Sequence, residues 1–377
     1  MSMSVGGSYR IDLRMAGVAG IQDALRRIWA SGIVGDQEAI QTRTYNLVVF
    51  VSDQATAAAT GQHIVELTAE RPGRVIFVDV EPGEEDRVDV WVSATHHAVG
   101  GRQVYGELIT LAVQGELRHE IHSTVVALLA PDLPVYLWWT GVLDVQDHLF
   151  LELCEMVDRI LLDTASCAEG IGTLEDLAGL PSRLLVSDLS WARLTPWRRA
   201  VAAVWDVPIL REPLRHIRSL DIHYIATGDR QNSERALLLA GWLGARLGWE
   251  LVEAGIGPTG GYTTTWRQGD WQGKVEVVES MISSLPAGEI AGIFVQAGDH
   301  PPFTMLSLVA MPDLGCIECR YNTAMSHKAQ VIHRFEPVST AAALAEELDL
   351  GYDPVYRDAL THTAGIVRLS RTQSGKA

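Results

Sequence analysis

The chain has 377 residues, of which 47% are hydrophobic and 20% are charged, and its formal net charge is −17. A chain of this length can bury a large core and commonly forms two domains. The negative charge argues against a nucleic-acid-binding protein, which usually presents a basic surface. No apolar stretch has the length of a membrane span, and the first residues lack the pattern of a secretory signal. We therefore expect a cytoplasmic protein that binds neither nucleic acid nor membrane.

The first part of the chain alternates between helical and strand patterns. A helical pattern over residues 18–30 precedes an apolar strand, Leu47–Val51, and Ser52 or Asp53 can cap the helix that follows. Strand patterns then cover residues 75–80, 88–93, 104–113, 135–139 and 159–163, and helical patterns cover residues 116–129 and 145–157. This alternation predicts that residues 1–168 form an N-terminal α/β domain, a mostly parallel doubly wound sheet with helices on both faces.

The second part of the chain changes character after a predicted linker at residues 169–185. A helix from Thr195, a strand from Asp221 and a helix over residues 234–247 come first. Short alternating runs then follow at residues 263–267, 274–278, 290–296, 304–310 and 316–321, and two helices close the domain. We expect residues 186–369 to form a C-terminal α/β or α+β domain with an antiparallel meander. Residues 370–377 are expected to be a flexible tail.

The segment Ala130–Gly141 is the most informative part of the sequence. Pro131 and Pro134 end the preceding helix, and a short apolar strand then ends in Trp138 and Trp139. Successive side chains of a strand point to opposite faces, so the two rings cannot fill the same core. Two arrangements remain open: one ring faces a crevice or a partner, or both are buried on the two faces of a central strand.

This segment resembles the OpcA family, the glucose-6-phosphate dehydrogenase assembly proteins. Further blocks of the chain resemble the same family in order, from about residue 44 to residue 250: Thr44–Val49, Arg159–Thr164, Asp188–Trp191, Arg193–Arg198 and Leu239–Trp249. The resemblance implies a partner, glucose-6-phosphate dehydrogenase, whose assembly or activity the protein promotes as a non-catalytic activator. It implies a place in NADPH production by the oxidative pentose phosphate pathway.

Aromatic side chains and arginines commonly anchor protein interfaces, so they are the predicted contacts with this partner. The candidate partner-binding residues are Pro131, Asp132, Pro134, Trp138, Trp139, Trp191, Trp197 and Arg198.

No group of residues in the sequence has the pattern of a catalytic or metal site. Gly255–Gly260 has the spacing of a dinucleotide fingerprint, but Pro258 and a strand-forming run follow where a helix should begin. His119 and His122 are three residues apart rather than the four of a zinc motif, which favours a solvated helix face. We therefore predict no catalytic residues, no metal and no cofactor.

One loop could bind an anion. Gly228, Arg230, Asn232 and Ser233 precede a predicted helix, whose amide groups could hold a phosphate. Simple capping by Asn232 or Ser233 is the favoured interpretation. The alternative functions are a sugar-phosphate or nucleotide-binding enzyme with its site at the carboxyl ends of the parallel strands near Trp139 and Thr140, and a ligand-sensing regulator that uses this loop.

Cys316 and Cys319 have the spacing of a redox pair. They lie in a strand-like run, where residues three apart point to opposite faces and are about 10 Å apart, too far for a disulfide. We expect two unpaired thiols, with reversible oxidation as the lesser hypothesis.

Overall fold

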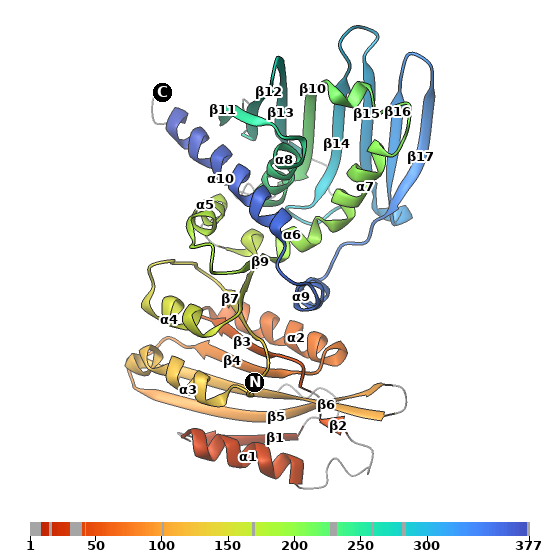
Figure 1. Ribbon diagram of the computed structural model, residues 1–377. Coiled ribbons are helices and arrows are strands. Elements are labelled where there is room, and N and C mark those ends of the chain that lie inside the picture. The colour runs from red at the N-terminus through yellow and green to blue at the C-terminus, as the bar shows by residue number, and fades with distance from the viewer. Residues whose placement is uncertain are drawn as a thin grey trace. The chain divides into compact units, whose positions relative to one another are not determined.

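The computed structural model describes residues 9–14, 17–30, 40–41, 43–99, 102–167, 170–226, 232–257, 260–280 and 284–374. The chain divides into two compact units, each with its own sheet (Figure 1). The N-terminal unit comprises Met1–Ala168, Pro181–Ser187 and Ser339–Tyr352. The C-terminal unit comprises Glu169–Leu180, Asp188–Val338 and Asp353–Ala377.

The N-terminal unit contains a sheet with the strand order β1-β5-β6-β4-β3-β7-β8-β9, and β2 pairs with β6. The strands are β1 (Tyr9–Arg14), β2 (Ile40–Gln41), β3 (Asn46–Val51), β4 (Arg74–Val80), β5 (Arg87–Val99), β6 (Arg102–Gln114), β7 (Val135–Thr140), β8 (Arg159–Leu162) and β9 (Val186–Asp188). The run β6-β4-β3-β7-β8 is parallel, whereas β5 pairs antiparallel with β6 and β1 with β5. The predicted mostly parallel α/β sheet is confirmed.

Helices form two groups around this sheet. Helices α1 (Val18–Ala30), α3 (Ile121–Leu128) and α4 (His148–Met156) contact one another in series, while α2 (Gln54–Glu70) contacts α9 (Thr340–Asp349). Every residue of β3 is buried, as expected for a central strand covered on both faces. The single helix expected over residues 116–129 is wrong, because a 3₁₀ turn at Gly115–His119 comes first and α3 begins only at Ile121.

The C-terminal unit contains a sheet with the order β11-β12-β13-β10-β14-β15-β16-β17. The strands are β10 (Ile217–Ile225), β11 (Glu250–Ile256), β12 (Tyr262–Gln268), β13 (Trp271–Ser280), β14 (Ile290–Ala297), β15 (Thr304–Met311), β16 (Cys316–Asn322) and β17 (His327–Arg334). The pair β10 and β13 is parallel, and the neighbouring pairs from β14 to β17 are antiparallel. The predicted meander is therefore confirmed.

The helices of the C-terminal unit are α5 (Ile171–Gly179), α6 (Leu189–Arg193), α7 (Thr195–Trp205), α8 (Glu234–Leu247) and α10 (Pro354–Ser374). Helix α8 packs on β10 and β13, and α7 contacts β17 (Figure 1). Gly244 of α8 lies against the fully buried Trp266 ring of β12: a Cβ there would be 2.6 Å from the ring, so a larger residue would push the helix off the sheet.

Three expectations about segment boundaries differ from the structure. Helix α5 occupies most of the segment expected as a linker, and its apolar face is buried at Leu174 and Leu177. Helix α9 belongs to the N-terminal unit although its residues were expected in the C-terminal domain. The expected tail begins inside α10, where Ser370 is buried and donates a hydrogen bond to the Ile366 carbonyl.

No helix in the described ranges combines the length and the apolar character that crossing a bilayer requires.

Candidate functional site

The two prolines before β7 bracket an exposed turn, Ala130–Pro134, called here the proline turn. Pro131, Asp132 and Pro134 are exposed. Asp132 adopts a positive φ of 59°, a conformation that non-glycine residues rarely take. The fully buried Asn46 side chain holds the turn with two hydrogen bonds. Its amide nitrogen donates to the Ala130 carbonyl (2.9 Å), and its amide oxygen accepts from the Ala130 N–H (2.7 Å). The proline turn is thus a rigid surface feature.

The tryptophan pair that follows is buried on both faces of β7. Trp138 is 3% exposed and Trp139 is 5% exposed. The Trp139 ring stacks on Phe50 at 3.9 Å and meets Phe150 of α4 edge-on at 5.1 Å. Of the two arrangements left open by the sequence, the structure therefore has the fully buried one, and neither ring faces solvent.

Two further tryptophans that were predicted to contact a partner, Trp191 and Trp197, are also buried, and the predicted contact Arg198 packs on one of them. The two rings are 2% and 0% exposed, so they belong to the core of the C-terminal unit. Trp191 donates from Nε1 to Asp353 (2.8 Å), and the Arg198 guanidinium lies 3.7 Å above the Trp191 ring. These aromatic side chains hold helices together and offer no exposed ring to a partner.

The carboxyl ends of the parallel strands are where α/β proteins usually bind ligands, at the point where the strand order reverses. Here that point lies between β3 and β7, beside Ser52, Asp53 and Gly141. The Asp53 carboxylate caps α2 by accepting a hydrogen bond from the Ala55 amide (3.0 Å). Gly141 has a positive φ of 100°, and a Cβ there would lie 3.1 Å from the Ser52 hydroxyl. The amide groups that could hold a phosphate therefore face a carboxylate of the chain itself.

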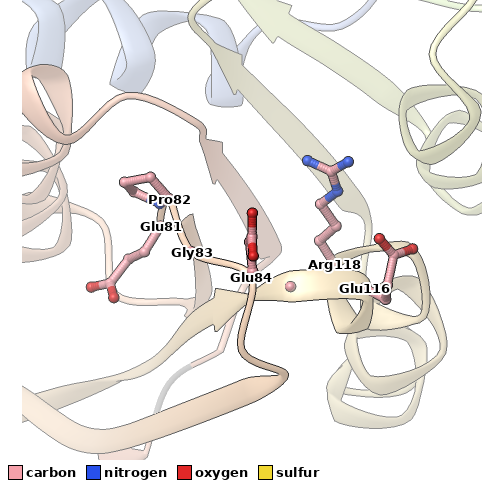
Figure 2. A pocket seen from close by; sticks show the side chains of 7 residues that line it. Glu81, Pro82, Gly83, Glu84, Glu116 and Arg118 are labelled. Carbon is pink, nitrogen blue, oxygen red and sulfur yellow. The ribbon is translucent and has the colours of Figure 1, made fainter.

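An acidic cavity of about 220 Å³ lies beyond the ends of β4 and β6 (Figure 2). Glu81, Glu84, Glu116 and Arg118 supply its charged side chains. Figure 2 shows the Glu81 side chain pointing away from Arg118, which agrees with the hydrogen bond that Glu81 accepts from the Gln114 amide group (2.7 Å). This cavity was not predicted, although the acidic turn Glu81-Pro82-Gly83-Glu84-Glu85-Asp86 directly after a strand is visible in the sequence.

Asp79 lies near this cavity, close to the end of β4. Its Oδ1 atom is buried and has no hydrogen-bond partner in the described part of the chain. Burial, with a smaller contribution from Glu81, raises the pKa of the Asp79 carboxyl above its usual range. The carboxyl end of the sheet therefore carries a concentration of negative charge.

The predicted anion loop is only partly described. Gly228 and Arg230 lie outside the described residues. Asn232 has a positive φ of 50°, and the Ser233 that begins α8 is fully buried but makes no capping hydrogen bond from its side chain. Of the two favoured capping residues, Asn232 and Ser233, capping by the Ser233 hydroxyl is therefore wrong.

His119 and His122, for which a solvated helix face was favoured, do not lie on one helix. His119 is in the 3₁₀ turn, whereas His122 is on α3 with its Nδ1 atom 3.1 Å from the Glu152 carboxylate of α4. His148 also approaches that carboxylate, at 3.4 Å. Within the described ranges, no three His, Cys, Asp or Glu side chains are arranged to hold a metal ion.

Cys316 and Cys319 both lie on β16 and are buried, unpaired thiols. Cys319 pairs across the sheet with the buried Leu308, and Cys316 pairs with Met311. Burial, and secondarily Glu318, raises the pKa of Cys319 to about 11. A thiol with this pKa is a poor nucleophile at neutral pH.

The family models and the curated relatives point to one family. Residues 65–179 match the model described as "Glucose-6-phosphate dehydrogenase subunit N-terminal domain", and residues 185–360 match the corresponding C-terminal domain. Two curated relatives, from Nostoc punctiforme and Synechocystis, are provisionally named OxPP cycle protein OpcA. The first is 27% identical over 81% of this chain and 67% of its own length, the second 23% identical over 81% and 66%. The chain thus matches about two thirds of these relatives.

Solved structures give only a distant likeness. A 3-ketoreductase from Actinomadura kijaniata is 11% identical, with a TM-score of 0.48 over 88% of this chain and 98% of the ketoreductase. The two family models cover most of both units, with a short gap between them. The chain therefore belongs to the OpcA family of glucose-6-phosphate dehydrogenase assembly proteins.

Proposed function

We propose that this chain is a non-catalytic assembly factor and activator of glucose-6-phosphate dehydrogenase in the oxidative pentose phosphate pathway. Both family models name a subunit of that enzyme, and the curated relatives are named for the OxPP cycle. The net charge of −17 agrees with a protein partner, because it opposes binding of polyanions.

The observation that carries the non-catalytic role is the capping of α2 by Asp53. A dinucleotide site places its pyrophosphate at this helix N-terminus, and a carboxylate already bonded to the Ala55 amide repels it. Glu81, Glu84 and Glu116 add negative charge at neighbouring strand ends. This arrangement opposes the alternative of a sugar-phosphate or nucleotide-binding enzyme with its site near Trp139 and Thr140.

The proline turn is the part of the OpcA-like segment that we assign to partner contact. Pro131, Asp132 and Pro134 are exposed, whereas Trp138 and Trp139 are buried. The two prolines and the Asn46 anchor hold the turn in one conformation, so little ordering entropy is lost when a partner binds. We place the contact at the turn and give the tryptophans the role of supporting it.

A coupled assay of NADPH formation tests the activator role. The chain alone should produce no NADPH from glucose 6-phosphate and NADP⁺, and adding it to the cognate dehydrogenase should raise the rate or lower the substrate concentration needed. The chain can raise the ratio of active to inactive dehydrogenase by no more than the ratio of its affinities for these two forms. Turnover by the chain alone, or an unchanged dehydrogenase rate at saturating chain, contradicts the proposal.

The same assay locates the contact. Asp132→Arg should weaken activation while the melting temperature stays within error, because the side chain is exposed. Glu155→Arg, which reverses an exposed charge on α4, is the matched control and should activate like the wild type. Equal activation by both variants would move the contact away from the proline turn and leave the activator role standing.

A further inference from the structure

In the part of the C-terminal unit that the structure describes, the sheet has one packed face and one open face. Side chains that point toward the helices are buried, among them Leu220, Ile222, Ile293 and Leu308. The residues that alternate with them are half-buried or exposed, which is the pattern of an antiparallel sheet with one side in solvent. In Figure 1, α7 and α8 lie across the same side of the sheet.

The open face carries exposed apolar side chains on β14 and β15, beside the polar Asp221 and His223 of β10. Phe294 on β14 is 38% exposed and Met305 on β15 is 50% exposed, and Val278 and Val309 lie on the same face. The Phe294 ring lies 4.7 Å from the imidazole of His223 on β10. Exposed Phe and Met side chains at the middle of a sheet are typical of a surface that another protein covers.

Charged residues lie on both sides of this centre in one row across the strands. The register aligns Glu276 with Asp221, Asp221 with Phe294, Phe294 with Ser307, and Ser307 with Arg320. Glu276 is thus two strands from Phe294 on one side, and Arg320 is two strands from it on the other. The row is acidic at one end, apolar at its centre and basic at the opposite end.

This order is self-complementary. A two-fold axis that runs along β14 places the Phe294 rings of two copies against each other and Glu276 of one copy over Arg320 of the second. Glu276 already contacts Lys274 (2.6 Å) and Arg320 contacts Glu318 (2.8 Å), so the contact between copies would join two ion pairs into one network. A different partner would need its own complementary surface, whereas a second copy already has it.

The face is also large enough. Eight strands about 4.8 Å apart and about 25 Å long cover roughly 900 Å², close to the roughly 800 Å² per partner of a standard protein interface. Two sheets that stack face to face keep their strands within about 30° of each other. At this angle the acidic end of the row in one copy still lies over the basic end of the row in the other.

We propose that the open face of the C-terminal sheet is the interface of a two-fold symmetric homodimer. This inference does not depend on the dehydrogenase, and either proposal can fail while the other stands.

Sedimentation of the full chain tests the dimer. The wild type should sediment at twice 41.2 kDa at micromolar concentration, and Phe294→Glu should be a monomer with an unchanged circular dichroism spectrum. Leu369→Glu is the matched control, because Leu369 is 37% exposed on α10, outside the sheet, and this variant should remain a dimer. A monomeric wild type, or a dimeric Phe294→Glu, overturns the proposal. If the dimeric Phe294→Glu variant also fails to bind the dehydrogenase, the open face is the binding surface for the enzyme instead.

A charge exchange between Glu276 and Arg320 tests the proposed two-fold axis, and it does not depend on whether the Phe294→Glu variant folds. Glu276→Arg and Arg320→Glu should each weaken self-association roughly tenfold or more, because each sets like charges against each other. The double variant restores opposite charges and should recover most of the lost affinity. A double variant as weak as the single ones overturns the proposed axis.

Discussion

Asn46 and Ala130 are joined by a reciprocal pair of buried hydrogen bonds, at 2.9 and 2.7 Å, across 84 positions of sequence. The Asn46 side chain therefore provides the hydrogen bonds that another backbone segment would otherwise make to Ala130, the first residue of the proline turn. A side chain that both donates and accepts is needed here, because the Ala130 amide and carbonyl are both buried.

Replacing Asn46 by Ala should lower the free energy of unfolding by about 2–4 kcal/mol, because it leaves two buried backbone groups without partners. Urea denaturation measures this change. Gln146→Ala, at an exposed loop position of the N-terminal unit, should cost less than about 0.5 kcal/mol and is the control. If Asn46→Ala unfolds at the wild-type midpoint, the anchor does not fix the turn.

The tryptophan pair should behave as core on both faces of β7. Trp138→Ala and Trp139→Ala should each cost about 3–5 kcal/mol of stability, because each removes a large buried ring. Trp139→Phe should cost less than Trp139→Ala, since it keeps an aromatic ring against Phe50 and loses the hydrogen bond to the Val142 carbonyl (3.0 Å). Thermal denaturation measures all three; a wild-type melting temperature for either alanine variant would mean that its ring is not part of the core.

Much of the fold could be predicted because strand and helix periods are local. The strand at Leu47–Val51, the capped helix after Asp53 and the meander from Thr263 to Tyr321 were all predictable in this way. The return of α9 to the N-terminal unit could not be predicted, because it depends on distant partners such as the Arg159 guanidinium, which donates to the Glu347 carbonyl (2.8 Å). Burial of Trp191 and Trp197 was missed for the same reason, since a ring's exposure depends on which helices pack over it.

The buried thiols should be inert in the native protein. At pH 8, a thiol with the pKa of Cys319, about 11, is ionised in roughly one molecule in a thousand. A thiol-specific disulfide reagent should therefore react with Cys319 only after unfolding, and Cys316→Ser should activate the dehydrogenase like the wild type. Leu314→Cys, at a position that is 70% exposed, gives the positive control for labelling. Rapid labelling of Cys319, or activation that depends on reductant, would restore the redox hypothesis.

Asp79 should lower the stability of the protein at neutral pH. Burial raises its pKa in the folded state above the value of about 3.9 for an unfolded chain, so folding favours the protonated form. Above the folded-state pKa the ionised carboxylate therefore costs stability, and the cost disappears as the pH falls through that pKa toward the unfolded value. Asp79→Asn removes the charge, so its melting temperature should exceed that of the wild type at pH 7, and the difference should shrink toward pH 4.

Glu84→Gln is the control for Asp79→Asn, because it removes an exposed acid from the same cavity and should leave the melting temperature nearly unchanged. Proteins often retain a destabilising buried charge where it serves function. Asp79→Asn should therefore also be tested in the dehydrogenase assay: a more stable variant that activates less would connect the acidic carboxyl end of the sheet to activation. A variant less stable than the wild type at pH 7 would show instead that the Asp79 carboxylate has a favourable partner in the folded chain, and the predicted sign of the pH dependence would be wrong.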